Sequence, residues 1–226
     1  MTYKIVIPFY SNIHLLRNIM KQMDINWNHI LIVDNSPLGE AKEFEGKGAT
    51  ILYYPENIGV AKSWNLALKG KCDWTFFVSN NAAFPNGFSE VLVSLNQAGP
   101  DCMLTDLAWH CNAISKDLVA KIGYFDENFY PAYYEDTDYY HRMCLAGISV
   151  AENPVVSIPA MTMRQANSLE AGLKLNFQAL AEYYKEKWGG YPGEEKFDKP
   201  FNKPENTLYS WTGQALNVLK ERQGFQ

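Results

Sequence analysis

The sequence predicts an α/β fold whose first half forms a sheet of buried strands, and three observations support this fold class. Short apolar runs end at polar turns, as the buried strands of a parallel sheet do. An asparagine-glycine turn leads into a helix between two of these runs. The last third of the chain changes to apolar residues at helical spacing. We therefore expect one α/β domain with a helical extension.

Four apolar runs are expected to form the strands of the first half. They cover residues 3–7, 30–33, 49–53 and 74–78. The first run ends at Pro8, the second at Asp34 and the fourth at the turn Ser79-Asn80-Asn81. Open α/β sheets bind their ligands outside the carboxyl ends of the strands, so these turns are expected to face a ligand.

Polar side chains at two of the turns have two possible uses each. The Asp34 carboxylate can accept a hydrogen bond from the imide N–H of a uracil, or it can form an Asx turn with its own backbone. The amides of Asn57 and Asn65, on either side of the helix start after Gly59, can hold a nucleotide or cap the helix. The residues alone leave both alternatives open.

An acidic segment beginning at Glu135 is the most informative part of the second half. Glu135 and Asp136 precede an amphipathic pattern and should occupy the first turn of a helix, where backbone N–H groups stabilise anions. That position suits a general base. The other interpretation is that the acids only cap the helix and that Asp138 pairs with Arg142 on its surface.

The order of these motifs resembles that of a known enzyme family. The segments are Pro8-Phe9-Tyr10, Val33 to Ser36, Glu56 to Gly59 with Asn65, Asn80-Asn81, Gly123 to Asp126, and Glu135 to Asp138. In this order they resemble the family-two-like inverting glycosyltransferases of the GT-A fold, over roughly the first two-thirds of the chain. The resemblance implies a Rossmann-like, nucleotide-binding mixed sheet flanked by helices.

The resemblance also implies a site for a nucleoside-diphosphate sugar, expected to be a UDP-sugar. The residues implied to frame the base are Pro8, Tyr10 and Asp34. Those implied to lie near the ribose and the phosphates are Asn57, Gly59 and Asn65, with the Asn80-Asn81 turn facing the phosphates.

The catalytic residue implied by the resemblance is Asp136. It would take the proton from an acceptor hydroxyl as that oxygen attacks the anomeric carbon, which gives inversion in one displacement. Glu135 would tune this base, because adjacent carboxylates raise each other's proton affinity. The residues implied to line the donor-sugar and acceptor cleft are Trp109, His110 and Asn112. For His110, an ordinary position in the core or on the surface is an equally good interpretation.

The sequence departs from the family at two metal-binding positions. The family's fourth strand ends in an acidic motif whose last aspartate binds a divalent cation, and a gap-free alignment places Asn81 there. Many relatives also have a histidine after the strand near 155–158, where this chain has none. Since hard cations prefer charged oxygen ligands, we expect that Mn²⁺ or Mg²⁺ is either not required or bound weakly. Arg164 is the first candidate to hold the diphosphate instead of a cation, and Lys62 is the second. The alternative for Arg164 is an arginine in a solvated loop without a role in binding.

Composition and charge narrow the partners only slightly. The chain has 226 residues, a net charge of −5 and a pI near 5.4, which give no electrostatic reason to expect nucleic acid or an anionic membrane as a partner. The expected acceptor is a saccharide or a lipid-linked saccharide, and a modified nucleic-acid base is the less favoured option. The four cysteines show no zinc spacing. Without a signal-like or membrane-spanning apolar run, a cytoplasmic location is expected.

We divide the chain into two expected parts. Residues 1–165 form the transferase domain, with a nucleotide-sugar half at 1–100 and an acceptor half at 101–165, and residues 166–226 form the helical extension. The expected apolar face of the extension consists of Leu173, Phe177, Leu180, Tyr184 and Trp188. A loop then leads to a last helix over 207–222. Packing, or a lid over the acceptor, is favoured over a membrane surface because acidic and basic residues mix on the polar face.

The sequence thus predicts an inverting glycosyltransferase, which moves a hexosyl or pentosyl group. Two other classes stay open at this point. A nucleotidyltransferase of similar topology would have a glycine-rich loop after the first strand, where this chain has Pro8-Phe9-Tyr10. A non-catalytic nucleotide- or glycan-binding protein is suggested by Asn81, and nucleotide release with an acceptor would exclude it.

Overall fold

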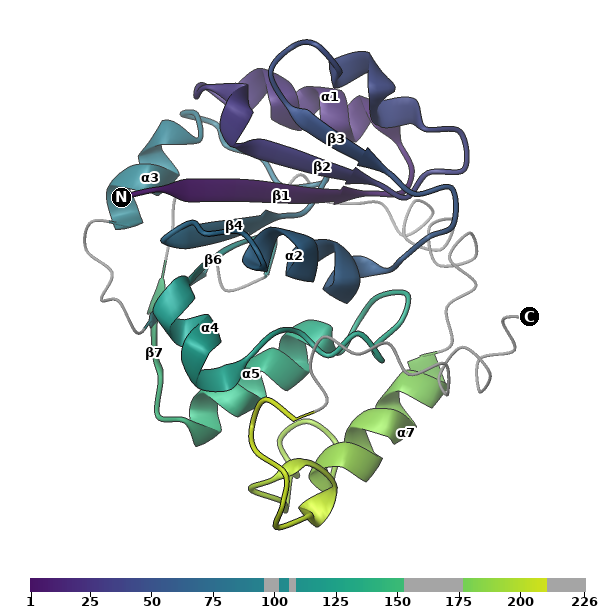
Figure 1. Ribbon diagram of the computed structural model, residues 1–226, viewed down its shortest axis with the longest axis vertical. Helices are drawn as coiled ribbons and strands as arrows, with labels where there is room; N and C mark the ends of the chain where they lie inside the picture. The colour runs from purple at the N-terminus through teal and green to yellow at the C-terminus, as the bar shows by residue number, and fades with distance from the viewer. Residues whose placement is uncertain (96–101, 106–108, 153–176, 211–226) are drawn as a thin grey trace.

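The computed structural model describes residues 1–95, 102–105, 109–152 and 177–210, and within them it shows one mixed sheet with helices on both faces (Figure 1). The strands are β1 (Tyr3–Phe9), β2 (Ile30–Asp34), β3 (Thr50–Tyr53), β4 (Trp74–Val78), β5 (Cys102–Thr105), β6 (Cys111–Ser115) and β7 (Ser149–Glu152). The α-helices are α1 (Ile13–Gln22), α2 (Val60–Leu68), α3 (Ser89–Leu95), α4 (Lys116–Ile122), α5 (Glu135–Leu145) and α7 (Phe177–Trp188). Three 3₁₀ turns are η1 (Trp27–His29), η2 (Glu40–Phe44) and η3 (Pro200–Asn202).

The strand order is β3-β2-β1-β4-β6-β5-β7. Strands β1 to β4 run parallel to one another, while β6 is antiparallel to both β4 and β5. The carboxyl ends of β1, β2 and β4 therefore lie at the same edge of the sheet as the amino end of β6. This mixed α/β architecture confirms the expected fold class, and it brings segments from both halves of the chain to one edge.

Side chains that alternate along the strands build a core on each face of the sheet. On one face Ile5, Ile32 and Phe76 pack with α1 and α3, and on the other Val6 and Phe77 pack with α2, α4 and α5 (Figure 1). Central strands buried on both faces need continuous apolar runs, which is why β2 and β4 were visible in the sequence.

Strand β1 extends beyond the expected end at Pro8. Pro8 pairs with Val33 of β2, and the strand ends only at Phe9. A proline fits here because β4 pairs with β1 only as far as Val6, so beyond that residue β1 has a partner on one side alone. The extension carries the chain to the edge where the strand ends meet.

Helix α7 packs on the α5 side of the molecule through part of the expected apolar face, whereas Phe177 of that face is 42% exposed. Leu180, Tyr184 and Trp188 are fully buried in a cluster that includes Phe129. Residues 173–176, the first part of the expected helix, lie outside the described residues, and so does most of the expected last helix. The described part of that last helix, residues 207–210, forms a turn. No helix among the described residues is long and apolar enough to cross a membrane.

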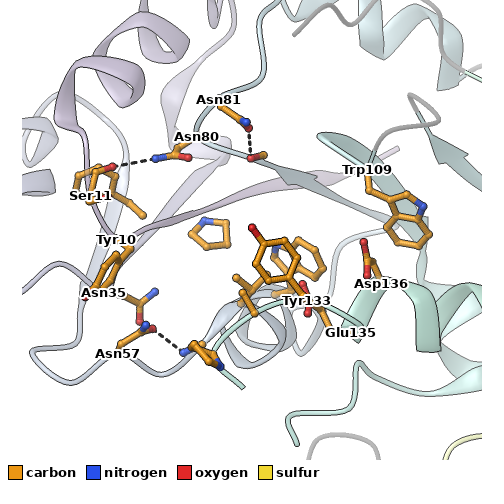
Figure 2. Close-up of a pocket in the computed structure, with 18 of the residues that line it drawn as sticks. Tyr10, Ser11, Asn35, Asn57, Asn80, Asn81, Trp109, Tyr133, Glu135 and Asp136 are labelled. Carbon is orange, nitrogen blue, oxygen red and sulfur yellow. Dashed lines mark hydrogen bonds between the residues drawn. The ribbon is translucent and has the colours of Figure 1, made fainter. Parts of the chain in front are cut away.

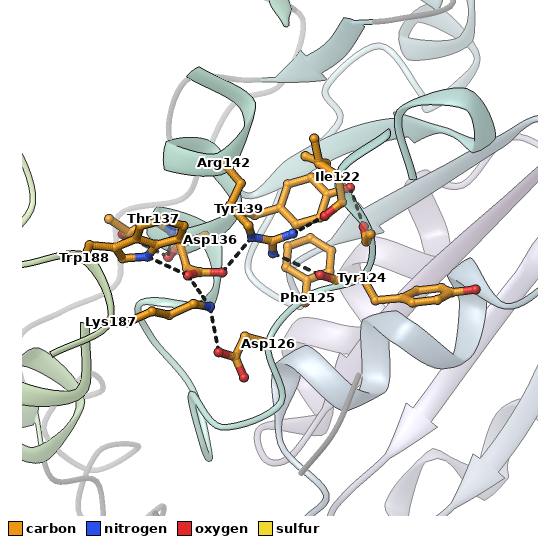
Figure 3. A network of polar contacts seen from close by, with 12 residues as sticks. Ile122, Tyr124, Phe125, Asp126, Asp136, Thr137, Tyr139, Arg142, Lys187 and Trp188 are labelled. Carbon is orange, nitrogen blue, oxygen red and sulfur yellow. Dashed lines mark hydrogen bonds and ion pairs between the residues drawn. The ribbon is translucent and has the colours of Figure 1, made fainter. Parts of the chain in front are cut away.

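A buried network of charges joins α7 to α5 (Figure 3). The ammonium group of Lys187 lies 2.7 Å from a carboxylate oxygen of Asp126 and 2.7 Å from one of Asp138. Arg142 donates to Asp138 over 3.0 Å and to the backbone carbonyls of Ile122 and Tyr124. The expected Asp138–Arg142 pair is therefore present, but it is fully buried rather than on the helix surface.

Two carboxylates and two cations balance in this network, so burial is tolerated. Burial alone would raise the pKa of Asp138, but the nearby charges of Lys187 and Arg142 hold this pKa below its usual value. The indole N–H of Trp188 donates to the same carboxylate over 2.8 Å. The network therefore fixes α5 against α7 and against the loop that follows α4.

Replacing Lys187 with methionine should lower the free energy of unfolding by about 3–5 kcal/mol, because two buried carboxylates lose their shared cation. Urea denaturation followed by tryptophan fluorescence would measure this change. Lys116→Met is the matched control, since Lys116 forms its 2.6 Å ion pair with Asp73 on the surface, and its unfolding midpoint should hardly move. Equal unfolding midpoints for both variants would show that the buried cation contributes nothing to the stability of the fold.

Candidate active site

A cavity of about 300 Å³ opens where the strand ends converge (Figure 2). Its walls come from the end of β1, the turn after β2, the turn after β4, the segment before β6 and the first residues of α2 and α5. Of the residues that the sequence singled out, those that line it are Pro8, Tyr10, Asn57, Gly59, Asn80, Asn81, Trp109, His110, Glu135 and Asp136. One cavity thus joins the expected donor residues to the expected base.

Asp34 does not face this cavity. Its carboxylate is fully buried and accepts from the backbone N–H groups of Ser36 and Ala41, each over 2.9 Å. The Asx turn that the sequence left open is therefore its use, and the expected contact with a uracil is wrong. The next residue, Asn35, lines the cavity instead. Alternation of side chains at a strand end could have indicated this, because neighbouring residues point to opposite sides.

The amide of Asn35 is held from three sides. Its nitrogen donates to Ser63 Oγ over 3.2 Å and to the Val33 carbonyl over 3.3 Å, and its oxygen accepts from the Ile58 backbone N–H over 3.0 Å. These bonds tie the turn after β2 to the start of α2. The cavity wall on this side is therefore a fixed surface.

The start of α2 depends on Gly59. This residue has φ +82°, and its N–H donates to the side-chain oxygen of Asn57 over 2.9 Å. The next N–H, from Val60, donates to the Pro131 carbonyl over 2.8 Å, and the Tyr130 hydroxyl donates to the Asn57 carbonyl over 2.7 Å. Helix α2 therefore begins in direct contact with the segment that leads into α5.

Two further residues that were expected to bind the nucleotide-sugar do not line the cavity. Asn65 is fully buried, and its amide donates to the Phe125 carbonyl and to Glu127 while accepting from the Phe125 N–H. Its place near the ribose is therefore wrong, because these bonds join α2 to the loop before α5. Lys62 is exposed and is not among the lining residues, and Arg164 lies outside the described residues.

The turn after β4 offers neutral groups where a divalent cation would need charged ones. The Asn81 side-chain oxygen accepts from the Ser79 hydroxyl, and the Asn80 amide donates to the Ser11 carbonyl over 3.1 Å (Figure 2). The described residues contain no group of three or more His, Cys, Asp or Glu side chains that could hold a metal ion. This donor set does not fit Mn²⁺ or Mg²⁺, which favour several anionic oxygens.

The acids at the start of α5 form the opposite wall. Glu135 is 5% exposed, and burial together with the charge of Asp136 raises its pKa well above the usual value. Burial also raises the pKa of Asp136. Hydrogen bonds to its carboxylate from the backbone N–H and the hydroxyl of Thr137, over 2.7 and 3.3 Å, oppose this rise. Asp136 lies beside Trp109 in Figure 2. The site therefore contains a carboxylate of raised basicity at the cavity wall.

Other residues correct or extend the expected cleft. Asn112 lies on β6 and is 1% exposed, but it is not among the residues that line the cavity. Three lining residues that sequence reasoning missed are Ser11, Trp64 and Tyr133. Trp64 is one of several apolar residues of α2, and no local signal in the sequence distinguishes it from the others.

Comparisons with known proteins identify the fold of this chain. The sequence matches no family model. A galactofuranosyl glycosyltransferase of Leishmania donovani is 54% identical over 35 residues, which make up 16% of this chain and 8% of that protein. The mannosyltransferase PcManGT of Pyrobaculum calidifontis, in complex with GDP-Man and Mn²⁺, superposes with a TM-score of 0.59 and 16% identity over 75% of this chain.

A second solved structure supports the same fold. A fragment of S. aureus TarS in complex with UDP has a TM-score of 0.55 and 12% identity, covering 84% of this chain and 72% of its own. The chain has the GT-A glycosyltransferase fold. It spans 59% of the length of the mannosyltransferase, so the likeness concerns this GT-A unit rather than the whole of that protein.

Gly59→Ala should destabilise the protein. An added Cβ would lie 2.9 Å from the Tyr130 ring and 3.0 Å from the Pro131 carbonyl, at a φ that L-residues rarely adopt. We expect a loss of roughly 1–3 kcal/mol in stability from strain, measured by urea denaturation.

The matched control for this change is Gly46→Ala. Gly46 also has a positive φ of 75°, but a Cβ there would meet nothing within 4 Å. It should lose less stability than Gly59→Ala, because only the strained φ acts there. If both variants unfold at the same urea concentration, the close contact of Gly59 with the segment before α5 contributes nothing to the loss.

Proposed function

We propose that the protein is an inverting glycosyltransferase that moves a sugar from a nucleoside-diphosphate donor to an acceptor hydroxyl. The observation that carries this proposal is the single cavity that runs from the ends of β1 and β2 to Asp136 in the first turn of α5. A nucleotide held at the strand ends would present its sugar to that carboxylate. The GT-A fold of the chain agrees with this arrangement.

The donor half of the cavity supports a nucleotide whose base lies near Tyr10 and Asn35. The Tyr10 ring offers a stacking surface, and both residues line the cavity together with Asn57. We propose a UDP-sugar as the donor. One neighbour of the same fold was determined with UDP, although another holds GDP-Man, so the base is a point to be measured.

The reaction we propose is a single displacement. The acceptor oxygen attacks the anomeric carbon and gives its proton to the Asp136 carboxylate. The bond from the anomeric carbon to the phosphate oxygen breaks, and the nucleoside diphosphate leaves with that electron pair. Burial raises the pKa of Asp136, which makes its carboxylate a stronger base, while the hydrogen bonds from Thr137 favour the ionised form and oppose that rise.

The leaving diphosphate needs partners other than a tightly bound cation in this proposal. The neutral amides of Asn80 and Asn81 line the cavity beside the end of β4 and can donate N–H groups to phosphate oxygens. Arg164 stays a candidate for this role, whereas the exposed Lys62 is the weaker of the two. Transfer that does not depend on Mn²⁺ or Mg²⁺ follows from this donor set.

We further propose that residues 1–165 are the transferring unit and that 166–226 support it through α7. The acceptor we propose is a saccharide or a lipid-linked saccharide, and the transferred group a hexose or pentose. A second candidate function is nucleotide or glycan binding without catalysis, which the neutral Asn81 favours. UDP release from a UDP-sugar in the presence of an acceptor would exclude it.

Asp136→Asn should abolish transfer while UDP binding stays nearly intact, because asparagine keeps the shape and loses the proton acceptor. A coupled assay of UDP release and a calorimetric titration would measure the two properties. The control is Asp117→Asn, which changes an exposed aspartate in the first turn of α4 and should leave the rate unchanged. Turnover retained in Asp136→Asn would show that Asp136 is not the catalytic base.

Asn81→Asp should make UDP binding respond to Mn²⁺, because a charged oxygen then replaces a neutral one at the turn after β4. We expect the wild-type affinity for UDP to be the same in EDTA and in Mn²⁺, and that of the variant to rise several-fold with Mn²⁺. Calorimetric titration of both proteins under both conditions measures this. A wild-type protein that binds UDP only with Mn²⁺ would contradict the cation-independent site.

A further inference from the structure

Three buried side chains near the α5 end of the cavity have polar atoms without a hydrogen-bond partner among the described residues. They are the indole N–H of Trp64, one carboxyl oxygen of Glu135 and both amide atoms of Asn112. These residues are 7%, 5% and 1% exposed. Leaving such a group without a partner costs about 1–3 kcal/mol, so several together on one side of a sheet call for a ligand or for bound water.

A chain of packed aromatic rings connects the three side chains. The Trp64 ring lies 4.9 Å from that of Phe125, which stacks on Tyr139 at 4.3 Å. Glu135 precedes Tyr139 by one helical turn, so both lie on one face of α5. Asn112 pairs with Phe77 across β4 and β6, and the Phe77 ring is 5.3 Å from Trp64.

The Trp64 ring cannot turn away to find another partner. Its neighbour Asn65 holds the Phe125 backbone by two hydrogen bonds of 2.9 Å, so the ring against which Trp64 packs is fixed. Phe77 covers it from the strand β4. The unpartnered N–H is therefore a property of this packing and not of a loose side chain.

Trp64 and Glu135 both line the cavity that contains Asp136, whereas Asn112 lies behind it. We propose that Trp64 and Glu135 form a subsite that holds hydroxyl groups of the transferred sugar. This inference rests on the proposed transferase function and adds the recognition of the sugar. A hydroxyl can accept from the indole N–H and can donate to or accept from a carboxyl group, so one ring of a sugar satisfies both residues.

The charge at this end of the cavity favours a sugar over a phosphate as the occupant. Glu135 is adjacent to Asp136, and the carboxylate of Asp136 repels anions. Burial of Glu135, with the neighbouring charge of Asp136, raises its pKa well above the usual value, which favours the protonated form that both donates and accepts hydrogen bonds. The position beside the base also places the anomeric carbon where Asp136 can serve an attacking hydroxyl.

Trp64→Phe tests this subsite, because phenylalanine keeps an aromatic ring in the stack and removes the N–H. The probes are UDP, UDP-glucose, UDP-galactose and UDP-N-acetylglucosamine, titrated calorimetrically against wild-type protein and variant. We expect affinity for the UDP-sugar that the wild type binds best to fall about 5- to 10-fold, with affinity for UDP unchanged.

The matched control is Trp27→Phe. The Trp27 indole donates to the Met23 carbonyl over 3.1 Å, and Trp27 packs on the face of the sheet that carries α1. This variant should leave both affinities as they are. A thermal melt of each variant shows whether it is folded.

A second pair of variants tests the carboxyl group. Glu135→Gln keeps a donor and an acceptor and should hold UDP-sugar affinity within about 3-fold of the wild type, while Glu135→Leu should lose about 10-fold with UDP affinity unchanged. Equal effects of Glu135→Leu on UDP and UDP-sugar would overturn the role of Glu135.

The results separate failure of the subsite from failure of the proposed function. If wild-type protein binds neither UDP nor any of the three UDP-sugars, the proposed UDP-sugar donor fails. If it binds them, but Trp64→Phe changes no affinity or changes all of them equally, the function stands and the subsite is overturned, with bound water as the partner of the indole. Binding of UDP with none of the three sugars would also count against the subsite.

Discussion

The position of the candidate base depends on one buried set of charges. Asp138, two residues after Asp136, is held by Arg142 on its own helix and by Lys187 on α7. Lys187 also contacts Asp126 in the loop before α5. Because each of these charges is stable in the core only with its partner, the helix, the loop and α7 are fixed relative to one another. Asp136 is thereby fixed at the cavity wall.

The same loop connects the base to the donor side. Asn65 of α2 binds the backbone of Phe125, and the N–H at the start of α2 binds the Pro131 carbonyl. The α2 end of the cavity and its α5 end are therefore parts of one bonded structure. Such a wall is preorganised, because its side chains are held in place before any ligand arrives.

Polar residues divide into two kinds in this protein. Asp34, Asn65 and Asp138 have all or most of their hydrogen-bonding capacity taken up by the protein, and each maintains a turn or a helix contact. Trp64 and Glu135 are equally buried but have groups without partners among the described residues, and both line the cavity. This difference in hydrogen-bond satisfaction separates residues that support the fold from candidates for ligand contact.

The sequence by itself determined the α/β class, the central strands, the apolar face of α7 and the acidic start of α5. These follow from local patterns of apolar residues and from helix-start chemistry, which a short segment carries alone. Only the tertiary structure decided that Asn35 rather than Asp34 faces the cavity, that Asn65 supports the loop, and that Trp64 lines the site. Those outcomes depend on which distant backbone groups reach a side chain first, and local sequence does not contain that information.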